Sequence, residues 1–368
     1  MKCEESGLYI YAFGDAEGVR KKGGRYMKKR LKKIVALSFV ALLAVGGLSG
    51  CKTNSSSSGN SIEITNVSYD PTREFYEKYN VEFAKYWKDK TGQELTVTQS
   101  HGGSGKQARS VIEGNEADVV TLALAHDITS IEEAGLIEEG WISEFEKNSS
   151  PYTSTIVFLV RKGNDKNIQD WSDLIKDGVN VITPNPKTSG GACWNFLSAW
   201  AYAKDLYNGD ETQIKDFVTK LYKNVGVLDS GARGATTTFV ENGQGDVLIA
   251  WENEAYLTLE EHPDEFEIIT PSISILAEPS VAIVDSVAKK RGTEEVAKEY
   301  LAYLYSDVGQ KIAGENYYRP TNPEILKEFS NVFNLDLNMV SIDDFGGWNE
   351  AYKVYFQDGG IFDQIYTQ

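Results

Sequence analysis

The sequence has few of the residues that most often carry metal or redox chemistry, since its 368 residues include only three histidines and three cysteines. None of His101, His126 and His262 is followed four residues later by a second metal-binding side chain, which excludes the helical two-histidine zinc motif. We therefore expect no metal site and no cofactor.

Motifs for a catalytic serine or a phosphate-binding loop are also missing. Residues 101–107, HGGSGKQ, come closest to both. A nucleophile elbow around Ser104 would need glycine where Lys106 stands. A P-loop would need serine or threonine in place of Gln107 and glycine in place of Ser100. The sequence thus argues against an enzyme, and a secreted hydrolase remains the weaker alternative.

Positive charge is scarce over most of the chain. Residues 52–368 carry 27 basic and 50 acidic side chains, a formal net charge of −23. This excess of acid argues against nucleic acid or anionic lipid as the main partner of the folded part. A small anion is still possible if local dipoles in a closed cleft bind it. The length and the 41% apolar content favour two domains with a sizeable core.

Basic residues gather instead before residue 52, where a secretory signal is predicted. Residues 27–33 form a positive segment, and the 15 uncharged residues 34–48 are fewer than the roughly 20 that span a bilayer. The following Leu-Ser-Gly-Cys sequence resembles the bacterial lipobox, so we predict a lipid on Cys51; an ordinary signal with an incidental cysteine is the alternative. Residues 52–60 are predicted to be a flexible tether.

Residues 1–26 fit no part of this scheme, and we interpret Met27 as the true start, with an incorrectly assigned or unstructured extension before it. After processing at Cys51 only Cys193 would remain, so no intramolecular disulfide is available. We expect Cys193 to pack as a small apolar group on a helix.

Strand-like and helix-like patterns alternate along the rest of the chain, which predicts βαβ units around mainly parallel sheets in an α/β fold. The predicted strands are residues 62–67, 94–99, 118–124, 154–161, 179–183, 246–251 and 266–275. The predicted helices are residues 72–90, 104–113, 170–176 and 189–207, and the pattern is mostly helical from residue 294 onward.

Three segments that we expect to open helices after strands are rich in small residues such as glycine and serine: residues 102–105, 188–192 and 230–236. A helix begins with unpaired N–H groups and a partial positive charge, and glycine lets an anion approach them closely. Each serine could instead be only an N-cap. If the three junctions met in one cleft, they could bind an anion without any cation.

Five segments, three of which overlap these junctions, resemble the periplasmic sulfate-binding protein family: residues 66–73, 99–107, 184–191, 227–234 and 246–253. The resemblance runs in order from residue 62 to residue 364. It implies a two-lobed, type II periplasmic-binding-protein fold that captures sulfate between its lobes and delivers it to the permease subunits of an ABC importer. We also expect the protein to be a monomer. Thiosulfate, or another tetrahedral oxyanion, is the alternative ligand.

The resemblance also implies which groups bind the anion, all of them uncharged hydrogen-bond donors. They are the hydroxyls of Ser104 and Ser189, the backbone amides of Gly190, Gly191 and Ala232, and the indole N–H of Trp251. Asp70 and Arg233 are expected to support the site. One departure is Cys193, where the relatives usually have arginine.

The expected domain boundaries follow from the same resemblance. Lobe 1 would comprise residues 61–150 and a return segment, 248–310, and lobe 2 would comprise residues 151–247. Residues 311–368 would form a C-terminal helical segment. Because the first crossover lies between Ser104 and Ser189, we expect the ligand to contact both lobes and hinge closure to enclose it.

Overall fold

The computed structural model describes residues 61–366. The predicted signal, the predicted lipid attachment at Cys51 and the predicted tether lie outside these residues. No helix among residues 61–366 is both long enough and apolar enough to cross a membrane.

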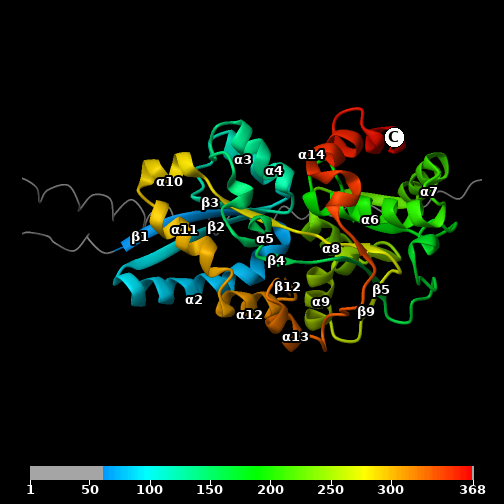
Figure 1. Cartoon of the computed structure of the whole chain (residues 1–368). Coiled ribbons are helices and arrows are strands. Elements are labelled where there is room, and N and C mark those ends of the chain that lie inside the picture. The colour runs from blue at the N-terminus through cyan, green and yellow to red at the C-terminus, as the bar shows by residue number, and fades with distance from the viewer. Residues whose placement is uncertain (1–60, 367–368) are drawn as a thin grey trace, which may run out of the picture. The chain divides into compact units, whose positions relative to one another are not determined.

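The first lobe, lobe 1, is built on a four-stranded sheet in the order β11-β3-β1-β2 (Figure 1). β1 pairs in parallel with β2 and β3, and β11 is antiparallel to β3. The strands are β1 (Ser61–Tyr69), β2 (Glu94–Gly102), β3 (Val119–Leu122) and β11 (Ser280–Ile283). The helices around them are α2 (Arg73–Thr91), α3 (Ser104–Ile112), α4 (Ala125–Glu133), α10 (Asp285–Arg291) and α11 (Glu294–Tyr303).

Aromatic residues at intervals of four place α2 against this lobe. Phe75, Tyr79 and Phe83 lie on one face of the helix and are buried. Tyr79 and Phe83 pack edge-on against Tyr300 of α11, with ring centroids 5.2 and 5.0 Å apart. The helix ends at Gly92, whose left-handed backbone (φ 76°) suits glycine. The periodicity of the sequence therefore predicts both the helix and its buried face.

The second lobe, lobe 2, contains a five-stranded sheet in the order β7-β6-β8-β5-β9. β6 pairs in parallel with β7 and β8, whereas β5 is antiparallel to β8 and β9. The strands are β5 (Ile156–Arg161), β6 (Val181–Pro184), β7 (Val225–Asp229), β8 (Val247–Trp251) and β9 (Phe266–Ile269). The helices are α6 (Gly190–Leu206), α7 (Glu211–Lys223), α8 (Ala232–Val240) and α9 (Glu252–Glu261).

In this topology the chain returns to lobe 1 later in the sequence than expected. β8 and β9 belong to the sheet of lobe 2, so the boundary expected after residue 247 does not hold, and the chain rejoins the first sheet only at β11. The reason is that β8 is buried along its whole length and pairs with β5 over five residues. The predicted strand 266–275 is two strands, β9 and β10 (Ser274–Ile275), and the helix predicted at 170–176 is the short 3₁₀ turn η3 (Trp171–Asp173).

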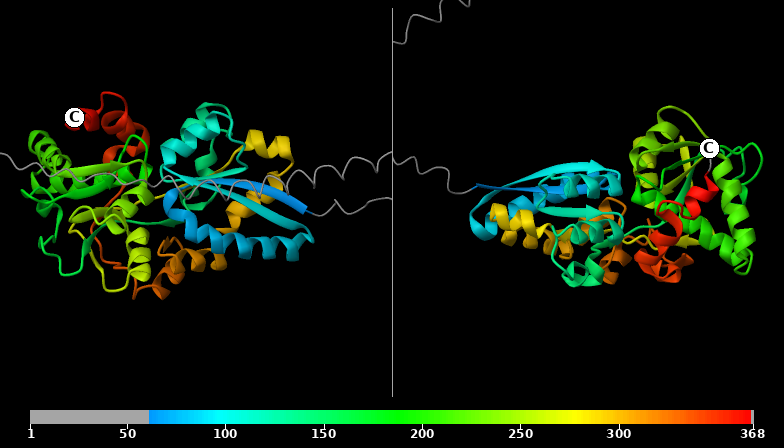
Figure 2. Two further views of the ribbon diagram at one scale, coloured as in Figure 1. Left: turned by 180° about the vertical axis from the view of Figure 1, so that it is seen from behind. Right: turned by 90° about the horizontal axis from the view of Figure 1, so that it is seen from above.

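Short elements join the lobes at the crossovers. β4 (Tyr152–Thr153) pairs with β12 (Arg319–Pro320), and β10 pairs with β13 (Met339–Val340). The other short elements are η1 (Asp70–Thr72), η2 (Trp141–Ser143), α5 (Glu146–Ser149), α12 (Asp307–Glu315), α13 (Pro323–Glu328) and η4 (Ile342–Phe345). Both lobes belong to one compact unit of the chain, and Figure 2 shows them from two further directions.

The last elements of the chain pack on lobe 2 and reach lobe 1. They are α14 (Gly347–Ala351), the π-helical turn η5 (Tyr352–Phe356) and α15 (Ile361–Ile365). Trp348 packs edge-on against Trp194 of α6, with ring centroids 4.6 Å apart. Tyr352 stacks on His126 of α4, with ring centroids 3.7 Å apart.

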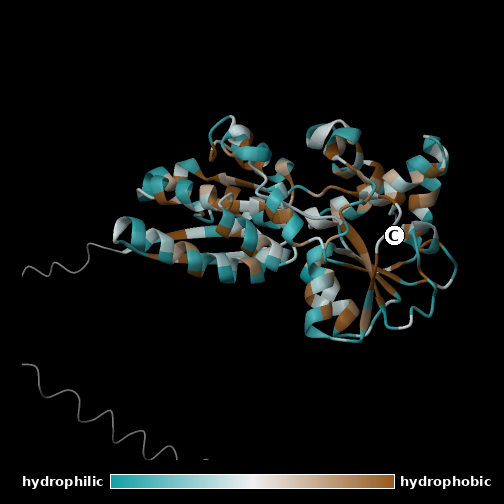
Figure 3. Ribbon diagram, turned by 60° about the horizontal axis from the view of Figure 1, so that its bottom comes forward, coloured by the Kyte–Doolittle hydropathy of each residue, from teal (hydrophilic) through white to brown (hydrophobic). Residues whose placement is uncertain are grey.

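The hydrophobic residues of both lobes are concentrated on the strands, and the outer helix faces are polar (Figure 3).

Candidate functional site

The starts of α3 and α6 meet between the two lobes. A Cβ atom placed on Gly103, just before α3, would lie 2.5 Å from the carbonyl oxygen of Thr188. A Cβ atom on Gly190 would lie 2.9 Å from the Cβ of Ser104 and from the Cγ of Leu124. Both contacts join lobe 1 to lobe 2, so the lobes are closed here, and they can approach this closely because glycine has no side chain.

The start of α8 lies against lobe 1 in the same way. A Cβ atom on Gly231 would lie 2.2 Å from a carboxylate oxygen of Asp70. Ala232, the first residue of α8, lines a cavity of about 10 Å³ together with Trp251. Gly191 faces the Trp251 indole, because a Cβ atom there would lie 2.8 Å from Nε1. The three glycine-rich junctions therefore converge on one region.

The predicted donors all stand in this region. They are Ser104 at the first position of α3, Ser189 at the N-cap of α6, Gly190 and Gly191 at its first two positions, Ala232 at the first position of α8, and Trp251 at the end of β8. Helix geometry leaves the first amides of each helix without an intrahelical partner. The arrangement can therefore present several N–H groups, from both lobes, to one small anion.

The hydroxyl of Ser104, predicted to donate to the anion, makes two hydrogen bonds within the protein in this structure. It donates a hydrogen bond to Asp127 Oδ2 at 2.5 Å and accepts one from the backbone N–H of Ala123 at 3.0 Å. A hydroxyl has a single hydrogen to donate, and here that hydrogen is directed at Asp127. To donate to an anion, the hydroxyl would have to exchange Asp127 for the anion; the backbone N–H of Ser104, in the first turn of α3, is a further donor.

Asp127 was not found by sequence reasoning. It lies 23 residues after Ser104, in the first turn of α4, and no local motif links the two. Burial raises the pKa of Asp127 to about 6, and the hydrogen bond from Ser104 opposes that shift. Near pH 7 the carboxylate is therefore mainly ionised and fixes the start of α3 by accepting the hydroxyl hydrogen.

The hydroxyl of Ser189 is in a different situation. Its oxygen accepts a long hydrogen bond from the backbone N–H of Ala192 at 3.4 Å, which caps α6. Accepting this bond leaves the hydroxyl hydrogen available for a second partner. Ser189 is 3% exposed, so a ligand that takes this hydrogen must be enclosed between the lobes.

The Trp251 side chain packs in the core and also donates a hydrogen bond. Its ring is 2% exposed and packs against Tyr69 with ring centroids 5.4 Å apart. Its Nε1 donates to the carbonyl oxygen of Gly191 at the long distance of 3.3 Å. The indole N–H thus points toward the start of α6, beside the predicted amide donors.

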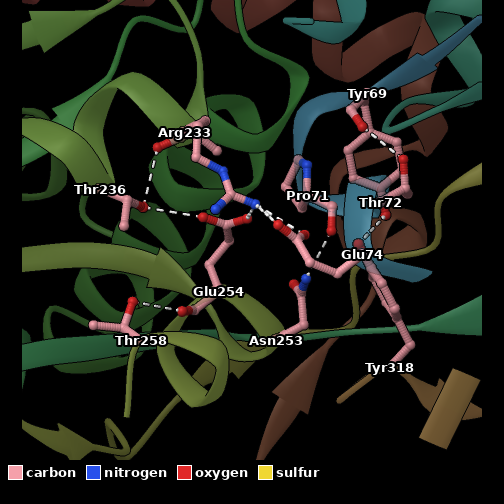
Figure 4. A network of polar contacts seen from close by, with 11 residues as sticks. Tyr69, Pro71, Thr72, Glu74, Arg233, Thr236, Asn253, Glu254, Thr258 and Tyr318 are labelled. Atoms are coloured by element: carbon pink, nitrogen blue, oxygen red, sulfur yellow. Dashed lines mark hydrogen bonds and ion pairs between the residues drawn. The ribbon is translucent and has the colours of Figure 1, made fainter. Parts of the chain in front are cut away.

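The two supporting residues lie at the edge of this region. Burial raises the pKa of Asp70, and the positive charges of Arg73 and Arg233 oppose the shift. Arg233 donates to both carboxylate oxygens of Glu74, at 2.7 and 2.9 Å, and lies 3.4 Å from Glu254 (Figure 4). Its charge is therefore compensated by carboxylates.

Other polar residues near these segments have partners of their own. Lys187 pairs with Asp358 and Asp363 of the C-terminal segment, at 3.2 and 2.9 Å. The Nδ1 of His101 lies 2.8 Å from Ser68 Oγ, and burial lowers the pKa of His101 to about 4, so the ring is neutral at pH 7. Cys193 is buried in α6, where burial raises the pKa of its thiol.

The chain is similar to known bacterial solute-binding proteins. The family model of the bacterial extracellular solute-binding proteins matches residues 72–319. A sulfate-binding protein of Escherichia coli is 62% identical over 306 residues, which are 83% of this chain and 93% of the relative. A thiosulfate-binding protein of Pseudomonas aeruginosa is 48% identical over 342 residues, 92% of this chain and 99% of the relative.

A solved structure of a sulfate-binding protein is also similar to this chain. The sulfate-binding protein SubI from Mycobacterium tuberculosis superimposes with a TM-score of 0.71 at 31% identity, covering 80% of this chain and 99% of SubI. The two-lobed architecture, the matched family model and the extent of these identities lead to one conclusion: this chain belongs to the bacterial extracellular solute-binding proteins, within the family of the sulfate- and thiosulfate-binding proteins.

Proposed function

We propose that this chain captures sulfate outside the cytoplasm and delivers it to an ABC importer, as a binding protein without catalytic activity. The observation that carries the proposal is the convergence of three helix starts from two lobes beside the Trp251 indole. The donors we assign are the hydroxyls of Ser104 and Ser189, the backbone amides of Gly190, Gly191 and Ala232, and the indole N–H of Trp251. The 62% identical sulfate-binding relative supports the same ligand.

The chemistry of the donors suits sulfate. Sulfate at neutral pH is a dianion with four acceptor oxygens and no hydrogen to donate, so donors alone can satisfy it. Hydrogen phosphate would leave its O–H unpaired in such a site, which costs about 1–3 kcal/mol. Hydrogen bonds to a charged group contribute roughly 1.5–3 kcal/mol each, so six donors suffice for micromolar binding, about −8 kcal/mol, after the costs of association are subtracted.

Neutral donors also fit the electrostatics around the site. Helix starts carry about half a positive charge, which stabilises an anion without an ion pair. The nearby cations Arg233 and Lys187 are already paired with carboxylates. Sulfate would therefore be held by dipoles from both lobes, and opening of the lobes would release it to the permease.

Thiosulfate is the second candidate ligand. The Pseudomonas aeruginosa thiosulfate-binding relative, at 48% identity over 92% of this chain, favours it. Thiosulfate is also a tetrahedral dianion with no hydrogen to donate, so the same donors would serve it.

The location we propose is the outer face of the cell membrane, with a lipid on Cys51 and a monomeric binding domain. The Leu-Ser-Gly-Cys sequence that ends at Cys51 supports the anchor, and the serine-rich residues 52–60 would separate it from the lobes.

Sulfate is expected to stabilise the protein against heat clearly more than phosphate does at the same concentration. By linkage, a ligand at 100 times its Kd stabilises the folded state by about 2.7 kcal/mol, which corresponds to a rise of several degrees in Tm. A thermal-shift panel with sulfate, phosphate and chloride measures this. Equal shifts for all three anions, or turnover of an aryl sulfate ester, would contradict the proposal.

A further inference from the structure

A short segment far along the chain, Tyr-Tyr-Arg at residues 317–319, packs around the junction of β8 and α9. It leads into β12, which pairs with β4. Tyr317 has a left-handed backbone (φ 62°), which a residue with a large side chain rarely adopts and which persists only where contacts hold it. Its ring stacks on Tyr256 of α9 with centroids 5.2 Å apart, and its hydroxyl donates to Glu260 at 3.2 Å. The segment is therefore fastened to α9.

Arg319 forms a buried ion pair with Glu252, the first residue of α9. The Nε and Nη2 of Arg319 donate to the two carboxylate oxygens at 2.7 and 2.8 Å, and both side chains are 4% exposed. The guanidinium also lies over the ring of Phe333, 5.1 Å from its centroid. Because two parallel hydrogen bonds fix the orientation of both planar groups, the Glu252 carboxylate is held in one place.

Glu252 directly follows Trp251, so the ion pair acts on the peptide next to the indole donor. The backbone N–H of Glu252 donates to the carbonyl oxygen of Thr155 at 2.9 Å, while Arg319 holds its carboxylate. Both the backbone and the side chain of Glu252 are thus fixed, which limits rotation of the chain at Trp251. A donor that is already oriented loses little freedom when a ligand binds.

Tyr318 supports the same indole through a second contact. Tyr318 is buried, and its hydroxyl accepts a hydrogen bond from the Tyr69 hydroxyl at 3.4 Å. The Tyr69 ring in turn packs against the Trp251 ring. Adjacent residues of one segment therefore contact both the residue that follows Trp251 and the ring on which its indole packs.

We propose that Arg319 is a positioning residue for Trp251: through Glu252 it keeps the indole N–H directed at the start of α6, without contacting the anion. The part that concerns the anion rests on the proposed function. Loosening of Glu252 should therefore weaken anion binding by no more than the indole hydrogen bond contributes.

The test neutralises the ion pair in the double variant Glu252→Gln, Arg319→Met, because removal of one partner alone would leave a buried charge unpaired. We expect sulfate affinity to fall about tenfold, and by no more than in Trp251→Phe. In a Trp251→Phe background the same neutralisation should change affinity by less than about twofold, since no indole N–H is left to position. In a Ser189→Ala background the loss of about tenfold should remain. Calorimetric titration with sulfate measures all of these affinities.

Arg319→Lys is the milder variant, and it carries the test if the neutral variant does not fold. It keeps the charge but loses the two parallel hydrogen bonds, so we expect a smaller loss of affinity with the same dependence on Trp251. An equal loss in the Trp251→Phe and Ser189→Ala backgrounds would overturn the inference.

The matched control is Asp118→Asn, Arg291→Met, which neutralises another sheltered ion pair. Asp118 is buried and lies 2.5 Å from Arg291, just before β3, at the end of the lobe 1 sheet opposite the start of α3. This variant should unfold at lower urea concentration but bind sulfate within about twofold of the unmodified protein. A loss of affinity as large as in the Glu252→Gln, Arg319→Met protein would contradict a specific role for Arg319.

The indole N–H resonance of Trp251 gives a reading that needs no ligand. It can be identified in ¹⁵N NMR spectra by its loss in Trp251→Phe, and it should move or broaden in Glu252→Gln, Arg319→Met but not in the control. If the unmodified protein bound no sulfate, the proposed function would fail. An unchanged resonance would separately refute the positioning role of Arg319.

Discussion

Gly190→Val is expected to abolish sulfate binding while both lobes remain folded. A Cβ atom at this position would lie 2.9 Å from Leu124 and Ser104, and both of those residues belong to lobe 1 whereas Gly190 belongs to lobe 2. The clash therefore exists only in the closed form. We expect affinity to fall by at least about 100-fold, equivalent to about 2.7 kcal/mol, which is within the usual cost of overpacking. Calorimetric titration with sulfate measures the loss.

The control for this variant is Gly105→Ala. Gly105 lies in the first turn of α3, one residue after Ser104, and a Cβ atom there would make only ordinary contacts, at 3.6 Å from Asp127 and 3.7 Å from Arg109. Binding by this variant should stay within a few-fold of the unmodified protein. Normal sulfate affinity in Gly190→Val would show that the lobes need not close at the start of α6.

Ser189→Ala separates the two roles that this serine can have. If the hydroxyl donates to the anion, its loss should weaken sulfate binding by about 10- to 100-fold, the equivalent of one hydrogen bond to a charged group. Loss of the N-cap to Ala192 should also lower the free energy of unfolding by about 1 kcal/mol. Calorimetry and urea unfolding without sulfate measure the two effects separately.

Ser189→Thr keeps the hydroxyl and is the matched variant. It should retain most of the affinity and most of the cap, since threonine caps helices nearly as well as serine. A Ser189→Ala protein that is less stable but binds sulfate normally would reduce Ser189 to a helix cap and remove it from the donor set.

The order of strands and helices could be predicted from the sequence because local signals are strong. Residues 72–90 carry aromatics at intervals of four, and the observed helix α2 runs from Arg73 to Thr91. Which sheet each strand joins was harder to predict. β8 is buried at every residue, so its sequence carries no sign of which sheet it joins, and the predicted return to lobe 1 was placed too early.

The candidate site, too, could be predicted from the sequence only in part. The three helix starts could be predicted because glycine and serine at a strand-to-helix junction are local signals, and the structure brings all three together. The partners of the site are not local. Asp127 takes the Ser104 hydroxyl from another helix, and Glu74 reaches Arg233 across 159 residues of sequence. Such contacts depend on how the lobes pack, which one sequence without its relatives does not record.

Calorimetric titration of the purified binding domain with sulfate and with hydrogen phosphate, in the same buffer near neutral pH, tests the central claim most directly. A cleft of neutral N–H and O–H donors predicts one sulfate per chain at micromolar affinity or tighter, and hydrogen phosphate bound at least about tenfold more weakly because its O–H finds no acceptor. Hydrogen phosphate bound as tightly as sulfate, or no heat with sulfate at millimolar concentration, would contradict it.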